Sequence, residues 1–175
     1  MSYRITGTGS CIPDIAKKNS DFLKNKFLDT NGGKFQSSNS EIIDKFNSIT
    51  GICERRYAPD EINCSDLAAV AAGLAINDSK LDQETLDYII VAHNTGDISC
   101  SSGQVDTLPS VASKVKAKLK IKNPNCVAYD IICGCPGWVE GIIQAKSFIK
   151  SGMAKKCLVI GCDTLSRILD ENDRD

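Results

Sequence analysis

Three short apolar runs place the strictest limit on the fold of this chain. Residues 87–93, 126–132 and 157–161 are each mostly apolar, without a regular alternation of apolar and polar side chains. Strands of this kind are buried on both faces, as in parallel sheets covered by helices. Segments with helical spacing lie between them. The alternation predicts an α/β fold with a mixed, mostly parallel sheet and helices on both faces.

Four helices and one further strand are predicted from spacing and end signals. Ser40 is the expected N-cap of a helix that ends at Thr50-Gly51. The other helices are expected from near Ser65, over 110–119 and over 137–151, and a core strand over 3–10. No linker or repeat divides the chain, which predicts a single domain over residues 1–175.

Composition excludes several classes of function. The net charge of -1 gives no global attraction to nucleic acid or to anionic membranes, and no apolar run approaches the roughly 20 residues of a membrane span. No secretory signal is recognisable, so a cytoplasmic protein is expected. The nine cysteines are an odd number in a core-rich chain, which favours reduced thiols over a disulfide framework.

The sequence around Cys135 carries the strongest chemical signal. The strand 126–132 breaks at Cys133-Gly134-Cys135-Pro136, and a helical pattern follows. Gly134 allows a sharp turn, and Pro136 suits a first helical turn. Cys135 is therefore expected beside a helix N-terminus, where the macrodipole and free N–H groups favour a thiolate. Such an elbow can hold a nucleophile and one donor of an oxyanion hole.

Other interpretations of these two cysteines are simpler. Cys135 could be a small thiol packed at a turn, since free cysteines are often buried. Cys133-Gly134-Cys135 could bind metal or cycle as a redox pair, but a structural zinc site normally needs four ligands and no second cluster exists. No metal site is therefore expected.

The sequence resembles the 3-oxoacyl-acyl-carrier-protein synthase III family, also called beta-ketoacyl synthase III. The likeness rests on the elbow, on Thr50-Gly51-Ile52 followed by Arg55-Arg56, and on the strand Val159 to Asp163. It implies a thiolase-like fold of which residues 1–175 form only the N-terminal half. The C-terminal half would be absent from this chain, which is expected to be truncated and incomplete for catalysis alone.

The resemblance also implies an activity. Cys135 aligns with the family's nucleophile, which takes an acyl group from a thioester and passes it to the carbanion of decarboxylated malonyl carrier protein. The implied protein is a transferase of fatty acid biosynthesis and lipid metabolism that uses acyl-CoA or acyl-carrier-protein thioesters and no cofactor. Acyl carrier protein is its expected partner, together with a homodimeric copy or a complementary C-terminal half.

The family's catalytic His and Asn come from the C-terminal half and are not in this chain. The single histidine, His93, matches no catalytic position, so a structural role is expected for it. Cys133 stands where the family usually has a small residue and is expected to pack in the interior.

Two departures from the family pattern concern the substrate. Lys45 and Ile49 stand near the positions where members primed by small acyl-CoA generally carry a Trp and an Arg that clamp CoA. Their absence favours a carrier-protein-bound or other acyl donor. Leu108 replaces a Phe that reaches the partner subunit's acyl pocket. The smaller side chain predicts a longer or branched primer.

Several alternatives remain open from the sequence. The chain could be a non-catalytic scaffold half, or part of a hydroxymethylglutaryl-CoA synthase-like or polyketide-type enzyme. Arg55, Arg56 and the lysines from Lys114 to Lys122 could dock an acidic carrier protein, or form a solvated face with a structural arginine pair. The helix 137–151 has apolar residues on more than one side, which predicts an exposed apolar patch in this chain alone.

Overall fold

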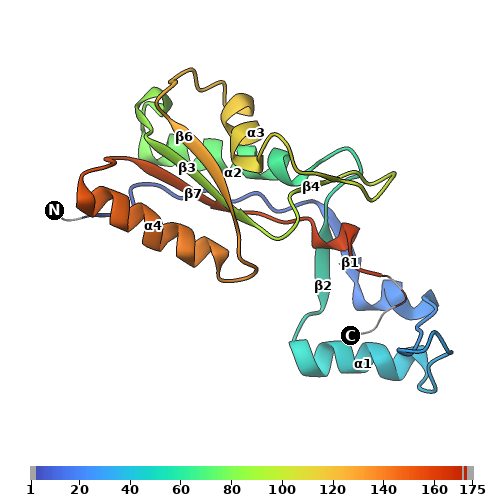
Figure 1. Cartoon of the computed structure of the whole chain (residues 1–175). Coiled ribbons are helices and arrows are strands. Elements are labelled where there is room, and N and C mark those ends of the chain that lie inside the picture. The colour runs from blue at the N-terminus through green and yellow to red at the C-terminus, as the bar shows by residue number, and fades with distance from the viewer. Residues whose placement is uncertain (1–2, 171, 173–175) are drawn as a thin grey trace. The chain divides into compact units, whose positions relative to one another are not determined.

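The protein is described here by a computed structural model that covers residues 3–170 and 172 (Figure 1). The chain forms two compact units, the first within residues 1–12 and 60–164, the second within residues 13–59 and 165–175. The sequence did not indicate this division, because no linker marks the boundaries between the two units. The two units are described separately.

The first unit is built on a three-stranded parallel sheet. Its strands are β3 (Tyr88–His93), β6 (Val127–Ile132) and β7 (Cys157–Gly161), in the order β6-β3-β7. Tyr88 lies opposite Val127 on one side and Cys157 on the other. The central strand β3 is buried along almost its whole length, as its continuous apolar sequence predicts.

Helices cover both faces of this sheet, which confirms the predicted α/β arrangement. Helices α2 (Cys64–Ser79) and α3 (Val111–Lys118) pack on the face that presents Ile89, Val91 and Ile160. Helix α4 (Gly137–Ser151) covers the opposite face, as Figure 1 shows. Gly141 of α4 lies so close to the sheet that a Cβ there would come within 2.7 Å of Val159 Cγ1.

The remaining elements of this unit are short. They are the hairpin of β4 (Asp97–Ile98) and β5 (Val105–Asp106) and the 3-10 turn η2 (Gln83–Thr85). Gly152 ends α4 in the left-handed conformation, which confirms the predicted end of this helix. Helix α3 is one residue shorter at each end than the expected 110–119, because Ser110 is its N-cap and accepts from Ser113 N.

The strand expected over residues 3–10 is wrong. This segment has no regular structure and runs along α2, where Thr8 N donates to Asp78 Oδ2 at 2.9 Å. A Cβ at Gly7 would lie 2.4 Å from Ala75 O, and one at Gly9 would lie 2.3 Å from Ala71 O. The two glycines therefore permit a close approach to the helix backbone in place of strand pairing.

The second unit contains an antiparallel pair and one long helix. Strand β1 (Ile15–Lys18) pairs with β2 (Glu54–Tyr57), and η1 (Asn19–Lys24), α1 (Asn39–Thr50) and η3 (Leu165–Arg167) complete it. The N-cap of α1 is Ser38 rather than the expected Ser40. Ser38 Oγ accepts from Glu41 N, while the Glu41 carboxylate accepts from Ser38 N at 2.8 Å. This capping box requires a spacing of three residues, which Ser40 does not have.

Three general findings bear on the function. All nine cysteines are free thiols. None of the helices in the described part of the chain is long and apolar enough to cross a membrane. Among residues 3–170 and 172, no three His, Cys, Asp or Glu side chains are grouped so that they could hold a metal ion.

Candidate functional site

The elbow predicted at Cys135 is present between β6 and α4. Gly134 adopts a φ of 60°, a left-handed value that a residue with a Cβ rarely takes. Gly137 N donates to Gly134 O at 3.0 Å, which closes the turn before the helix begins. Cys135 lies inside this turn and is exposed.

The N-terminus of α4 is open beside this thiol. Pro136 is the N-cap residue, and its side chain makes no capping hydrogen bond. A 15-residue helix has a partial positive charge at this end, and its first N–H groups have no partner in the preceding turn of helix. The elbow therefore combines an accessible sulfur with backbone donors, the two groups that an acyl-accepting nucleophile needs.

Cys133 is not buried, in contrast to its expected packing role. It directly follows strand β6, is exposed, and lies two residues before Cys135. Because Gly134 turns the chain sharply, both thiols are accessible from the surface of this chain. The assignment of the nucleophile to Cys135 thus rests on its place next to the helix, since exposure does not distinguish the two.

Two polar residues lie next to the elbow turn, and neither was expected from the sequence. Asn94 follows β3 and Asp163 follows β7. Asn94 N and Asn94 Nδ2 donate to the two carboxylate oxygens of Asp163 at 2.9 and 2.7 Å. This bidentate contact directs Asn94 Oδ1 toward Gly134, where it lies 3.6 Å from the position that a Cβ would occupy.

The signal for this pair was present in the sequence. Polar residues stand within two positions of the ends of two apolar strands, and the carboxyl ends of neighbouring parallel strands meet at one edge of a sheet. Asn94, Asp163 and the Cys133–Cys135 turn all follow strands of the same sheet, so they share that edge.

His93 has structural contacts. Its ring is 5% exposed, and Nε2 lies 3.0 Å from Asp130 Oδ2. Asp130 also accepts from Val111 N and Ala112 N, both at 2.8 Å, at the start of α3. Burial alone would raise the pKa of Asp130, but the hydrogen bonds from His93 and the two backbone N–H groups lower it below its ordinary value.

Leu108, the expected acyl-pocket residue, lies in the loop between β5 and α3. Its side chain is 82% exposed, and it precedes Pro109 through a cis peptide bond. Among the residues that the structure describes, Leu108 therefore lines no enclosed pocket, and its contribution to an acyl pocket stays a prediction.

Most of the basic residues considered for carrier-protein docking have partners inside the chain. Lys114 Nζ contacts Asp97 and Asp106, Lys116 Nζ donates to Cys126 O, and Lys118 Nζ contacts Asp66. In the second unit, the Arg55 guanidinium lies over the rings of Phe22 and Phe46 and donates to Asn19 Oδ1. These contacts fit the structural interpretation of the basic residues.

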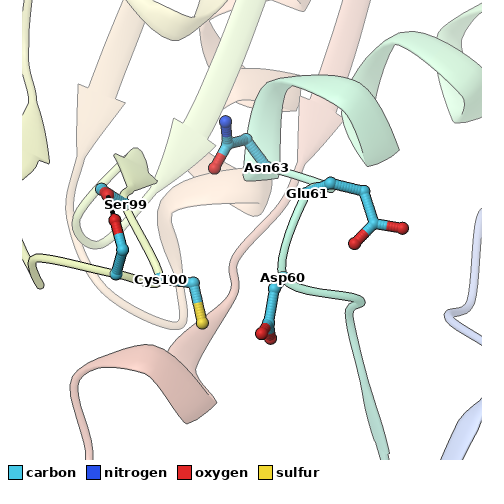
Figure 2. Close-up of a pocket in the computed structure, with 6 residues that line it drawn as sticks. Asp60, Glu61, Asn63, Ser99 and Cys100 are labelled. Atoms are coloured by element: carbon cyan, nitrogen blue, oxygen red, sulfur yellow. Dashed lines mark hydrogen bonds between the residues drawn. The ribbon is translucent and has the colours of Figure 1, made fainter.

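A hollow of about 480 Å³, whose lining includes none of the elbow residues, lies in the first unit (Figure 2). Its lining comes from the segment before α2 and from the β4–β5 turn: Asp60, Glu61, Asn63, Ser99, Cys100 and Ser101. Figure 2 shows the two carboxylates on one side and Ser99 and Cys100 on the other. No large apolar side chain lines this hollow, whereas acyl-binding sites are lined mainly by such side chains.

Comparison with known proteins gives a consistent result. Residues 129–175 match the family model of 3-oxoacyl-[acyl-carrier-protein (ACP)] synthase III. The chain is 39% identical over 175 residues to a beta-ketoacyl-[acyl-carrier-protein] synthase III of Neisseria gonorrhoeae, and 38% identical over 174 residues to one of Vibrio parahaemolyticus. Each alignment covers 99% of this chain and 48% of the relative. The chain thus spans about half the length of the curated relatives it matches.

The fold agrees with the sequence match. The crystal structure of 3-oxoacyl-[acyl-carrier-protein] synthase III from Aquifex aeolicus superimposes with a TM-score of 0.76 at 34% identity, over 98% of this chain and 48% of that one. The chain accordingly has the thiolase-like fold of one half of such an enzyme. In sequence and in fold, it corresponds to the N-terminal half of the 3-oxoacyl-[acyl-carrier-protein] synthase III family.

Proposed function

We propose that the protein is an acyltransferase of the decarboxylating condensing class, in which Cys135 carries the acyl group. The exposed thiol at the uncapped start of α4 is the observation that supports this most directly. The family match supports the same class of chemistry in fatty acid or related lipid or polyketide biosynthesis.

The proposed reaction has two steps at this sulfur. The Cys135 thiolate attacks the carbonyl carbon of an acyl thioester; the C–S bond to the donor breaks, and the donor thiol leaves with a proton. Decarboxylation of malonyl carrier protein releases CO₂ and gives a carbanion, which attacks the acyl carbon and frees Cys135. A backbone N–H at the elbow would stabilise the negative oxygen in both steps.

The full reaction needs groups beyond this chain. The resemblance assigns a His, an Asn and a second oxyanion donor to the C-terminal half of the family. We therefore propose that this half works with such a partner region, in a homodimer or with a complementary chain. Acyl carrier protein is the proposed protein substrate, without a cofactor and in the cytoplasm.

Paired variants of the two elbow cysteines test the proposal in the complete protein. Condensation of an acyl thioester with malonyl carrier protein would be followed by mass spectrometry of the product. Cys135→Ala is expected to lower the rate by about 1,000-fold or more, because the nucleophile is lost. Cys133→Ala is the matched control and should retain most activity. Equal losses, or loss only in Cys133→Ala, would refute the assignment.

The acyl specificity is a further part of the proposal. Leu108 is smaller than the Phe of acetyl-primed relatives, so the pocket that it helps form should accept a longer or branched primer. In the complete enzyme, octanoyl donors should therefore acylate Cys135 faster than acetyl donors, and Leu108→Phe should reverse that order. A clear preference of the native protein for acetyl would exclude this specificity.

The non-catalytic scaffold is the main alternative. The protein would be such a scaffold if neither Cys133 nor Cys135 can be acylated in the complete, folded assembly. An accessible thiol at an open helix terminus has no role in such a scaffold, which is why we favour the enzyme. A hydroxymethylglutaryl-CoA synthase-like or polyketide-type product would be identified by the same product analysis.

A further inference from the structure

Two cysteines that are far apart in the sequence lie side by side in the first unit. Cys64 Sγ donates to Cys162 Sγ at 3.0 Å, across a sequence separation of 98 residues. A disulfide bond has an S–S distance of about 2.05 Å, so the two sulfurs are roughly 1 Å from bonding distance.

Both members of the pair are held by well-anchored backbone. Cys64 is the first residue of α2, and its neighbour Ser65 donates from N and Oγ to the buried Asp97 at 2.7 and 2.8 Å. Cys162 directly follows β7, and its N–H donates to Ala92 O at 3.0 Å. The packing of α2 on the sheet therefore sets the sulfur–sulfur distance, which does not depend on a flexible loop.

We propose that Cys64 and Cys162 form a reversible redox pair that closes to an intrachain disulfide in the presence of a peroxide. One thiol attacks the O–O bond of hydrogen peroxide, which gives a sulfenic acid and one water. The second sulfur then attacks the sulfenic sulfur, the S–O bond breaks, and a second water leaves. The two thiols lose two electrons and two protons in total, which reduce the peroxide to two waters, and a dithiol reductant returns both to the disulfide.

The environments of the two sulfurs decide their order of reaction. Cys64 is fully buried, whereas Cys162 is half-buried. The hydrogen bond to Cys162 and the burial of the side chain both raise the pKa of Cys64, so this sulfur keeps its proton. Cys162 is therefore the sulfur that meets peroxide first. Cys64 resolves the sulfenic acid, and its proton passes to the hydroxyl group that leaves as water.

The bond would join the sheet edge that carries the elbow to helix α2. Cys162 precedes Asp163, whose carboxylate holds Asn94 behind Gly134. A disulfide would tie this strand end to the start of α2. The proposal does not depend on acyl transfer, because it concerns sulfurs outside the elbow.

Disulfide mapping in the purified protein tests the proposal. After treatment with hydrogen peroxide, blocking of free thiols and tryptic digestion, the peptides that contain Cys64 and Cys162 should appear as one species. Its mass should equal the sum of the two peptides less two hydrogen atoms. Tandem mass spectra must place the link on Cys162, because Cys157 lies in the same tryptic peptide. Dithiothreitol should restore the separate peptides.

Matched serine variants give the controls. Cys64→Ser and Cys162→Ser should each abolish the linked species, and circular dichroism would show that both variants are folded. Cys100→Ser removes an exposed thiol and should leave the link intact. The proposal is overturned if peroxide oxidises Cys100 while Cys64 and Cys162 stay unlinked, or if the link involves Cys157 instead.

Discussion

At the scale of single residues, Asp130 connects a neighbouring strand and a helix, and no motif in the sequence indicates this role. Its carboxylate accepts from His93 on the adjacent strand and from two N–H groups at the start of α3. It therefore fixes both the only histidine and the position of a helix. A substitution that removes the carboxylate charge of Asp130 but keeps the size of the side chain tests this role.

Asp130→Asn should lower the free energy of unfolding by about 2 kcal/mol at neutral pH, since three donors lose a charged acceptor. The pKa of Asp130 is lower in the folded than in the unfolded protein, where it is about 3.9. Its stabilising effect is therefore complete above that value and is lost as the pH falls through the folded-state pKa.

Urea unfolding at several pH values measures this effect. The difference between the wild type and Asp130→Asn should shrink in acid, whereas Asp44→Asn on the exposed side of α1 should match the wild type throughout. A difference independent of pH would show that the lowered pKa contributes nothing to stability.

Asn94 and Asp163 make a second prediction at this scale, which rests on the proposed function. Asp163→Ala and Asn94→Ala should each slow acylation of Cys135 by about 10-fold or more, because a small displacement of a nucleophile is costly. A double variant should be no slower than either single one, since the two residues act as a unit. Additive losses, or unchanged rates in folded variants, would show that the pair does not position the elbow.

At the scale of elements, the sequence predicts the regular core well and the irregular segments poorly. The three strands and the ends of α4 follow from continuous apolar runs and from Gly152. The segment 3–10 could not be placed in the same way, because its glycines allow close contact with α2 as readily as strand pairing. Ser38 could have been found as the cap, since Glu41 stands three residues later.

The candidate site also was only partly predictable from the sequence. The turn at Gly134 was predictable from one glycine between a strand and a helix. The contact of Asn94 with Asp163 depends on the order β6-β3-β7, which no local pattern specifies. Residues 69 positions apart meet only once that order is known.

The close packing of α4 on the sheet gives a prediction for this helix. In an exposed helix, replacing a glycine by alanine raises the free energy of unfolding by about 1 kcal/mol through helix propensity. Here the new Cβ would meet Val159 Cγ1 at 2.7 Å, so we expect a net loss of about 1–2 kcal/mol. Chemical denaturation should show this loss, while Ser147→Ala on the exposed side of α4 should be neutral or stabilising. A stabilised Gly141→Ala would mean that the helix lies further from the sheet.

At the scale of the whole molecule, helix α4 has an apolar surface that none of the described residues covers. Trp138, Val139 and Ile143 on α4 are each about half exposed, at 48%, 52% and 47%. This confirms the expectation from the sequence that a single sheet cannot bury all the apolar residues of this helix. Because the chain spans about half of its relatives, we expect that a complementary half covers this face in the complete protein.

Residues 1–175 expressed alone should therefore self-associate. Sedimentation velocity should show oligomers or aggregates at micromolar concentration, and Val139→Glu with Ile143→Glu should shift the population toward the monomer. Substituting two exposed positions elsewhere, such as Ser147→Glu with Lys150→Glu, provides the control. A native fragment that stays monomeric would show that this face needs no cover.

The central claim is that Cys135 is the sulfur that accepts an acyl group, and it can be tested most directly by locating that group. The complete protein would be incubated with an octanoyl thioester and no malonyl substrate, digested at low pH, and examined by tandem mass spectrometry. The account predicts one octanoyl group per chain, on Cys135, and none on Cys133 although both are exposed. An acyl group on Cys133, or an unmodified Cys135 in an enzyme that still turns over, would contradict it.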